Sequence, residues 1–488
     1  MSSAPQRLIL RNTLLLIGAQ VLAAPLSILI NAVAARKLGP TDFGQLYLAS
    51  TFSSLVFLIV EWGQYGTLTA MVARDRSRAG ELLGSGLTLR LAVLPVLLLI
   101  LFGGCALAGY DTRFLRVLSW ILLAAVFGSV ASACQDIIRG YERTDIASAS
   151  VVASQLLGVS IVVPTLLLSG SLTSFLISQV ACAVAGTVIL VSLLPVLGVP
   201  RVSVSRKTCR ALFGAGTSFL LFNLINALQP NVDAAFLSKL ASPEAIGWQA
   251  AARKLAGMLV FPASALTATL YPTLSRLFAE DRAAYRSAAA GALRATPAIA
   301  LPIALSCALF PSIGIDLFGE SGYGPAAANL RIMAVFILLL YMTMPVSASL
   351  LAAGRQRVWT AAQFACVALS AVVDPWLIPW FQARNGNGGL GVCIASVAGE
   401  AMMLAAGLYL LPRDVLERSL WRSYGSIASA GALMAVVALA LSRFSPYAAA
   451  PAALTAYAAG MWITGGLDKS QLELLQSLVR RKPAAPAP

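Results

Sequence analysis

The chain has 488 residues, of which 58% are hydrophobic and only 11% are charged, and its mean hydropathy is +0.81. Soluble globular proteins carry about 25% charged residues, so this composition excludes a water-soluble fold of this length. The net charge of +15 does not indicate a nucleic-acid partner, because basic residues of membrane proteins gather in cytoplasmic loops, and the lack of histidine argues against a transition-metal site.

Continuous apolar runs such as Leu91–Leu101 favour spanning helices over the short alternating strands of a membrane barrel. With about 20 apolar residues per span, we predict an all-α polytopic membrane protein with about 14 transmembrane helices. The first run exceeds the roughly 7–15 residues of a signal peptide, so we interpret it as a span. The predicted spans are residues 12–35, 43–65, 84–108, 114–138, 145–169, 172–196, 212–238, 245–270, 290–313, 326–350, 358–382, 389–411, 422–442 and 446–466.

The basic residues test this map independently. With the N-terminus placed in the cytoplasm, and with Arg116, Arg294 and Arg422 at the span ends counted with the adjoining segments, 24 of the 35 lysines and arginines fall in cytoplasmic segments, 7 in outer segments and 4 within spans. This asymmetry follows the positive-inside rule. We therefore predict that both termini are cytoplasmic.

A weak repeat divides the chain into halves. KLGPTDFG (Lys37–Gly44) follows the first predicted span, and KLASPEAIG (Lys239–Gly247) follows the seventh. Two six-helix halves that start on the same side form a parallel repeat, which suits an alternating-access transporter; chance similarity between apolar segments is the alternative. We predict an N-terminal lobe (1–196), a C-terminal lobe (197–413), two further helices (414–467) and a cytoplasmic tail (468–488).

No sequence motif for nucleotide or metal chemistry is present. There is no Walker loop, no GxGxxG after a strand and no cluster of metal ligands. The seven cysteines are scattered and lie mostly in apolar runs, which is typical of small core residues. The loops are short and contain no long segment with paired carboxylates, as a membrane glycosyltransferase would need. We therefore predict a protein that is not an enzyme and needs no cofactor or metal.

Charged residues inside spans are rare, costly and functional by default. Arg253 lies roughly 12 Å into the eighth predicted span, near the bilayer middle. Lys254 follows it, and Gln249 shares its face one turn earlier. This pattern predicts a phosphate or carboxylate site, with a structural ion pair to an acid of a neighbouring span as the alternative. Arg90 and Arg331 are further substrate-binding candidates, although both are shallow enough to snorkel.

Four acidic residues are candidates for ion coupling. Glu400 lies near the middle of the twelfth predicted span, and Asp374 lies past the middle of the eleventh. Either can titrate and couple transport to H⁺ or Na⁺, and pairing with a buried arginine is the alternative. Asp233 and Glu61 lie close to span ends, where capping or solvation is the competing role.

The seventh predicted span is unusually polar. Asn226, Gln229 and Asp233 share one face at spacings of three and four residues. Asn231 adds a further amide, and Pro230 frees a backbone carbonyl. We interpret this span as a cavity wall that binds sugar hydroxyls, with hydrogen bonding between helices as the alternative.

Four segments carry a resemblance to a known family. AARKLGPTDFGQLYLA (Ala34–Ala49) is the most specific, and NVDAAFLSKLASPEAIGWQAAARK (Asn231–Lys254), ASLLAAGRQR (Ala348–Arg357) and GLGVCIASVAGE (Gly389–Glu400) support it. Together they resemble the bacterial polysaccharide, or O-antigen, flippases of the multidrug/oligosaccharidyl-lipid/polysaccharide exporter superfamily. EWGQYG (Glu61–Gly66) departs from the Asp-Leu-Gly-like turn of that family.

The resemblance implies two six-helix lobes plus two C-terminal helices, in the bacterial inner membrane. It implies flipping of a polyprenyl-pyrophosphate-linked oligosaccharide to the outer leaflet for lipopolysaccharide, O-antigen or exopolysaccharide assembly. The expected partners are this substrate, membrane lipid, H⁺ or Na⁺, and a glycan polymerase or glycosyltransferase. The main alternative is a cation-coupled multidrug or metabolite antiporter of the same superfamily, against which Arg253 and Lys254 argue. A membrane enzyme, a scaffold and a lipid II-type flippase are lesser alternatives.

Overall fold

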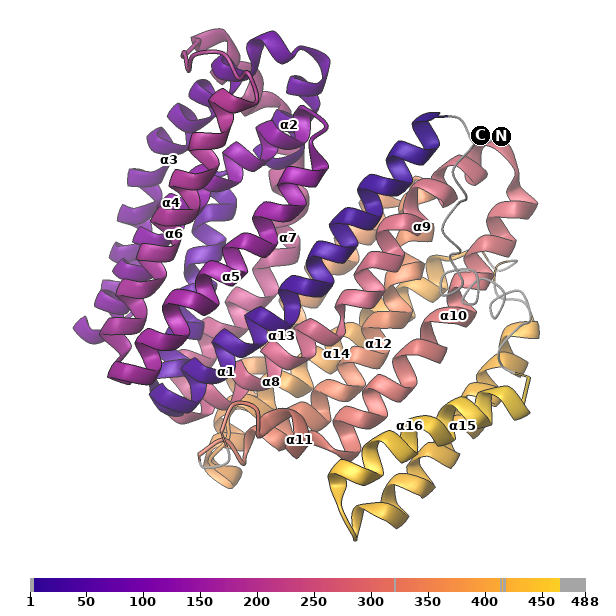
Figure 1. The fold of residues 1–488 in the computed structure, drawn as a ribbon. Coiled ribbons are helices and arrows are strands. Elements are labelled where there is room, and N and C mark those ends of the chain that lie inside the picture. Colours follow the sequence, from indigo (N-terminus) through magenta and orange to yellow (C-terminus); the bar gives the residue numbers. More distant parts are fainter. Residues whose placement is uncertain (1–3, 320–321, 413–414, 416–417, 466–488) are drawn as a thin grey trace, which may run out of the picture. The chain divides into compact units, whose positions relative to one another are not determined.

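The computed structural model describes residues 4–319, 322–412, 415 and 418–465, and the predicted tail (468–488) lies outside them. The described residues form helices and no strand, which confirms the all-α fold class (Figure 1). The helices are α1 (Ala4–Val60), α2 (Gln64–Arg74), α3 (Ala79–Leu107), α4 (Thr112–Gly140), α5 (Thr144–Ser169), α6 (Leu172–Val196), α7 (Arg206–Leu240), α8 (Pro243–Leu259), α9 (Phe261–Glu280), α10 (Arg282–Leu309), α11 (Pro311–Ile315), α12 (Ala326–Ala352), α13 (Gln356–Asn385), α14 (Gly389–Leu410), α15 (Arg418–Ser442) and α16 (Pro446–Ile463), with a 3₁₀ turn at Arg76–Arg78.

α1 consists of two helices that meet at a sharp break. Gly39 has a φ of 76° and a ψ of 173°, a backbone conformation that residues with a side chain rarely adopt. Pro40 then begins the second helix, where its fixed φ and missing N–H carry no penalty. The break lies within the motif KLGPTDFG and separates the first two predicted spans.

Ten described helices are long and apolar enough to cross a membrane, or eleven when the two parts of α7, bent by 53°, count as one span. The first of them runs from Gly18 to Arg74 and covers most of the first predicted span and all of the second. The eighth predicted span is wrong as one continuous helix, because Val260 interrupts the helical run between α8 and α9. The number of fourteen spans stays a prediction.

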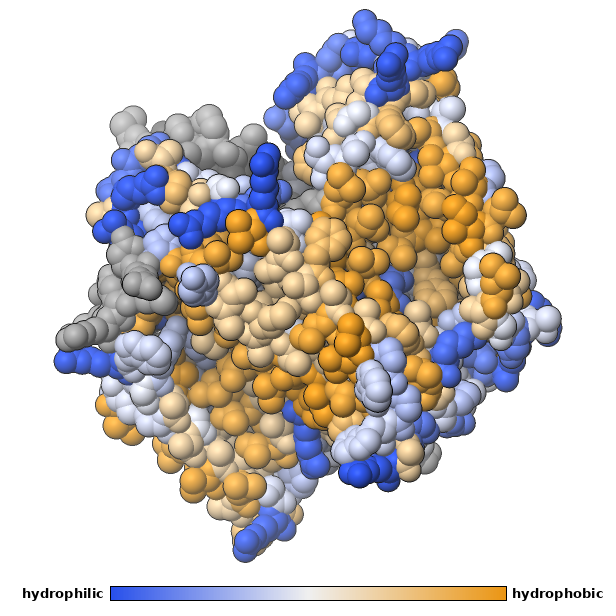
Figure 2. Space-filling view, turned by 180° about the vertical axis from the view of Figure 1, so that it is seen from behind, coloured by the Kyte–Doolittle hydropathy of each residue, from blue (hydrophilic) through white to orange (hydrophobic). Residues whose placement is uncertain are grey.

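The sides of the helices carry many exposed apolar side chains. In α3, Leu91 is 64% exposed and Leu99 is 76% exposed, and in α13 Trp376 is 78% exposed. Figure 2 shows hydrophobic side chains covering the helix sides on the face in view, with hydrophilic side chains gathered near helix ends. Soluble proteins rarely expose apolar patches of more than a few hundred Å², so this surface fits lipid. The chain is a multi-pass membrane protein.

The chain divides into two compact units. The first comprises Met1–Lys254, Ile315–Asn329 and Gln363–Gly399, and the second comprises Leu255–Gly314, Leu330–Ala362 and Glu400–Pro488. In the first unit, helices α2, α3 and α4 contribute Leu68, Leu82 and Ile137 to one buried core. In the second, α15 and α16 pack together and against α10, with Met434 and Ala453 buried between them. The boundaries of the two predicted six-helix lobes stay a prediction.

The two repeat motifs contact each other within the first unit. A Cβ added at Gly247 would lie 2.0 Å from the carbonyl oxygen of Pro40, and one added at Gly44 would lie 3.0 Å from the carbonyl oxygen of Pro243 and 2.8 Å from the nitrogen of Gly247. Each glycine therefore faces the proline carbonyl of the other motif. Only glycine permits this backbone approach without a shift of one helix.

The segment between α11 and α12 is hydrogen-bonded to the end of α1's first helix. Arg36 donates from Nε to the carbonyl of Leu317 at 2.9 Å and from Nη2 to that of Asp316 at 2.7 Å. The hydroxyl of Tyr323 donates to the carbonyl of Ala35 at 3.3 Å, and burial raises the pKa of this phenol. Arg36 thus stabilises a contact between distant segments.

Candidate functional site

Arg253 in α8 pairs with Asp233 in α7, with 3.8 Å between Nη1 and Oδ2. The aspartate side chain is 2% exposed, whereas the arginine side chain keeps 27% of its surface exposed. The sequence offered no acid three or four residues from Arg253 on its own helix, and the partner lies on the preceding helix instead. The structural ion pair, which the sequence analysis gave as the alternative role of Arg253, is therefore present. Its separation of 3.8 Å is longer than the 2.7–2.9 Å or so of a tight charge-assisted hydrogen bond.

Lys254 is exposed, and no acid of the described residues lies within ion-pair distance of its ammonium group. Because successive helix residues point about 100° apart, Lys254 and Arg253 present their charges in different directions. Lys254 therefore offers a positive charge without a partner in the described part of the chain. This is the state that a phosphate-binding residue needs before its ligand arrives.

Gln249 belongs to a buried amide network rather than to an exposed polar stripe. Its side chain is 1% exposed, and its Oε1 accepts from Nδ2 of Asn329 at 3.0 Å and from Sγ of Cys393 at 3.0 Å. Asn329 in turn accepts from Nδ2 of Asn387 at 2.8 Å. The sequence analysis missed Asn329 and Asn387, which lie near the starts of α12 and α14. Their positions in the sequence follow no helical spacing that would connect them with Gln249. The amide of Gln249 is thus turned into the core, and its role in binding a ligand together with Arg253 stays a prediction.

Asp233 and Asp374 form a buried acid pair. Asp374 in α13 is 0% exposed and lies near Asp233, and the carboxylate oxygens of both residues are buried without a hydrogen-bond partner among the described residues. Two ionised carboxylates repel each other strongly in a low dielectric, and neither can donate a hydrogen bond. The pair therefore favours one shared proton or a bound monovalent cation. The interfacial role considered for Asp233 is wrong, because this side chain is buried.

The polar face of α7 makes hydrogen bonds to neighbouring helices. Oδ1 of Asn226 accepts from Nε2 of Gln363 at 2.8 Å, and Nε2 of Gln229 donates to Ser370 at 3.3 Å. Asn231 is 7% exposed and donates to the carbonyl of Ala227 on its own helix. Asn226 is nevertheless exposed, so it remains a candidate for contact with sugar hydroxyls.

Glu400 and Arg331 lie in the second unit. Glu400 is partly buried and lies within hydrogen-bonding reach of the hydroxyl of Thr343. Arg331 is exposed, which agrees with snorkelling. The residues predicted from the sequence thus fall into both units, and the first unit holds ten of the twelve, namely Arg253, Lys254, Gln249, Asn226, Gln229, Asn231, Arg90, Asp374, Asp233 and Glu61.

Arg90 does not snorkel, which corrects the sequence-based expectation. Its residue is only 3% exposed, and Nε donates to Oε1 of Gln64 at 2.9 Å. Nη1 donates to the hydroxyl of Ser132 at 2.9 Å and to the backbone carbonyl of Ser129, and it lies 3.6 Å from Oε1 of Glu61. The side chain points inward because α2, α4 and the turn that holds Glu61 supply acceptors that the sequence spacing does not reveal.

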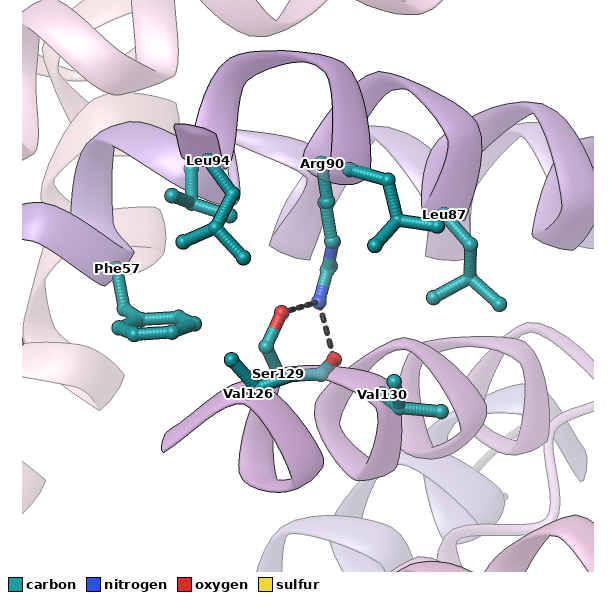
Figure 3. A pocket seen from close by; sticks show the side chains of 9 residues that line it. Phe57, Leu87, Arg90, Leu94, Val126, Ser129 and Val130 are labelled. Carbon is teal, nitrogen blue, oxygen red and sulfur yellow. Dashed lines mark hydrogen bonds between the residues drawn. The ribbon is translucent and has the colours of Figure 1, made fainter. Parts of the chain in front are cut away.

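A small pocket of about 90 Å³ lies beside this arginine. Figure 3 shows Arg90 extending from α3 to Ser129 of α4, with Leu87, Leu94 and Phe57 around it. Arg90 and Ser129 are the polar members of an otherwise aliphatic and aromatic lining. Among the described residues, no group of three or more His, Cys, Asp or Glu side chains could hold a metal ion.

Comparisons with known proteins give the fold and the family. Residues 9–278 match the family described as "Polysaccharide biosynthesis protein". The fold is similar to that of the lipid II flippase MurJ in an inward closed conformation, with a TM-score of 0.71 and 13% identity over 96% of this chain and 100% of that one. It is also similar to an inward-facing multidrug resistance MATE family transporter of the MOP superfamily, with a TM-score of 0.57 and 16% identity over 80% of this chain and 92% of that one. No curated protein sequence matches the chain.

The helices are long and apolar enough to cross a membrane, and their fold is shared with this flippase and this MATE family transporter. The chain belongs to the polysaccharide biosynthesis protein family, because the match covers more than half of its length. The two structural neighbours are named as a flippase and a transporter, and the absence of enzymatic activity in this chain stays a prediction.

Proposed function

We propose that the protein flips a polyprenyl-pyrophosphate-linked oligosaccharide from the cytoplasmic to the outer leaflet of the bacterial inner membrane by alternating access. The flipped glycan would serve lipopolysaccharide, O-antigen or exopolysaccharide assembly, next to a glycan polymerase or glycosyltransferase. The observation that carries the proposal is the family match over residues 9–278. The basic pair on α8 supports it, since a multidrug carrier for organic cations would gain nothing from positive charge there.

The chemistry of the substrate explains the need for these cations. Pyrophosphate entering a low-dielectric site loses its hydration, which costs many kcal/mol unless cations replace the water. Arg253 is 27% exposed and only loosely held by Asp233, so it can turn to a phosphate. Its planar guanidinium can bind two phosphate oxygens at once, and Lys254 adds a mobile point charge. Exposed amides such as Asn226 would meet the sugar hydroxyls.

The acid pair supplies a coupling site in the same proposal. Asp233 and Asp374 together carry one negative charge more than Arg253 neutralises when both are ionised. A proton or Na⁺ entering the pair restores the balance, and phosphate binding by Arg253 would remove its positive charge from the pair. Loading of the ion and loading of the substrate are thereby linked. Glu400 and Glu61 remain further coupling candidates.

Reconstitution into liposomes tests the function directly. We expect purified protein to move a fluorescent polyprenyl-pyrophosphate oligosaccharide between leaflets, as measured by quenching with an impermeant reductant, at a rate well above that of protein-free vesicles. A fluorescent organic cation should not be accumulated. Transport of the cation without lipid flipping would overturn the proposal in favour of the antiporter.

The proposed orientation can be tested by thiol labelling in intact cells. Single cysteines placed at Arg206 and Arg282 should react only after the inner membrane is made permeable, because both positions are expected in the cytoplasm. Cysteines at Ser242 and Gly386 should react with an impermeant maleimide in cells with an opened outer membrane. The native cysteines are buried or partly buried, which keeps the background low. Labelling on the opposite side at any of the four positions would break the predicted topology.

A further inference from the structure

The turn Glu61–Gly63, between α1 and α2, has an unusual backbone. Trp62 has a φ of 48° and Gly63 a φ of 64°, so both lie in the left-handed region. A tryptophan rarely adopts this conformation, because its Cβ approaches the neighbouring carbonyl oxygen. Such strain persists only where surrounding contacts impose it. The contacts on both sides of the turn therefore need an explanation.

On one side, the turn interlocks with the first part of α7. The ring of Trp62 stacks on Phe213 with 4.4 Å between centroids, and Nε1 donates to the carbonyl of Phe213 at 3.1 Å and to Oγ1 of Thr217 at 3.3 Å. The backbones also meet directly. A Cβ added at Gly216 would lie 2.0 Å from the carbonyl oxygen of Trp62, and one added at Gly63 would lie 2.2 Å from that of Gly216.

On the other side, Arg90 holds both ends of the turn. It lies 3.6 Å from Oε1 of Glu61, just before Trp62, and donates at 2.9 Å to Gln64, just after Gly63. Ser132 in α4 donates to the same carboxylate oxygen of Glu61 at 2.7 Å. Arg90 is therefore the one described cation that contacts the residues flanking the strained pair on both sides.

We propose that Arg90 is a positioning residue that fixes the Glu61–Gly63 turn as a latch against the first part of α7. The ion pair with Glu61 and the bond to Gln64 hold the backbone in the left-handed geometry that seats Trp62 between Phe213 and Thr217. Loss of either flanking contact releases the latch. The latch itself is argued from these contacts alone. Its role in transport rests on the proposed function, because alternating access requires α7 to be held and released as the protein changes state.

Hydrogen–deuterium exchange in nanodiscs, without substrate, tests the latch. In Arg90→Met, exchange in residues 57–66 and 210–221 should rise about tenfold, because both sides of the interlock open together. Exchange in α15, which belongs to the other compact unit, should not change. Glu61→Gln should produce the same local pattern, and Arg90→Lys should restore part of the protection.

Arg143→Met is the control. Arg143 lies just before α5, its side chain is 49% exposed, and it pairs with Asp145 at 3.0 Å, outside residues 57–66. This variant should leave exchange in residues 57–66 at the wild-type level. Equal acceleration across all helices in Arg90→Met, or an unchanged turn, would overturn the latch. In the flipping assay, the Arg90→Met variant, present at the wild-type protein level, should flip lipid about fivefold more slowly than wild type. An unchanged flipping rate would also overturn the latch. If the wild-type protein itself flips no lipid, the proposed function is refuted and the latch is not.

Discussion

Replacing Arg253 by alanine is expected to lower glycan export by about 10- to 100-fold. A hydrogen bond to a charged group contributes about 1.5–3 kcal/mol, and each 1.4 kcal/mol or so is tenfold in rate or affinity. The expected loss follows if the guanidinium meets the pyrophosphate during flipping. The measurement is surface glycan in a flippase-null strain complemented with the variant, with the amount of inserted protein quantified in parallel.

The ion pair with Asp233 makes the lysine variant decisive. Arg253→Lys keeps the charge that Asp233 needs but loses the planar fork that binds two phosphate oxygens. For a substrate-binding arginine, we expect normal protein level with partial export. For a purely structural ion pair, Arg253→Ala should lose the protein, because it leaves Asp233 buried without a partner, and Arg253→Lys should export normally. Arg116→Ala, at an exposed arginine of α4, is the control.

Replacing Asp374 by asparagine is expected to uncouple transport from the ion gradient. The amide preserves the shape of the side chain and removes the charge that a shared proton or Na⁺ would neutralise in the acid pair. Flipping driven by an imposed pH or Na⁺ gradient should fall by about tenfold or more, whereas folding should be preserved, because a buried uncompensated charge has been removed. The readout is the initial rate in liposomes with and without each gradient.

Asp145→Asn provides the matched control for Asp374→Asn. Asp145 has a 42% exposed side chain and forms a local pair with Arg143 at 3.0 Å. This variant should keep the full response to the gradient. If Asp374→Asn also keeps the full response to both gradients at normal protein level, the acid pair is not the coupling site, and Glu400→Gln becomes the next variant to test.

The helical fold could be predicted from the sequence, because a segment that crosses lipid must be a long apolar helix. Apolar runs of span length and the asymmetry of basic residues locate helices without knowledge of their neighbours. The eighth predicted span failed because the break at Val260 lies inside an apolar run, where only Pro262 at the start of α9 marks it. The break in α1 was easier to place, because Gly39 and Pro40 favour it locally.

The candidate site could be predicted only in part, because the pairing of side chains between helices depends on how the helices are rotated and packed. Arg253 was identified from its depth, but its partner Asp233 lies 20 positions earlier, at no helical spacing. Arg90 was assigned to the membrane surface from depth alone, yet contacts with α2, α4 and Glu61 turn it inward. The amide network around Gln249 was missed for the same reason, as its members come from three separate segments.

The contact between Gly44 and Gly247 has a consequence for how such a chain can arise. Each glycine faces the carbonyl of the proline in the other motif, four residues before the other glycine. In a homodimer with two-fold symmetry, a surface meets its own copy in this reciprocal way. The junction thus has the form of an isologous dimer interface enclosed within one polypeptide. A protein of half this length, pairing with a second copy through the same glycine, would already possess the contact that the fused chain now makes internally.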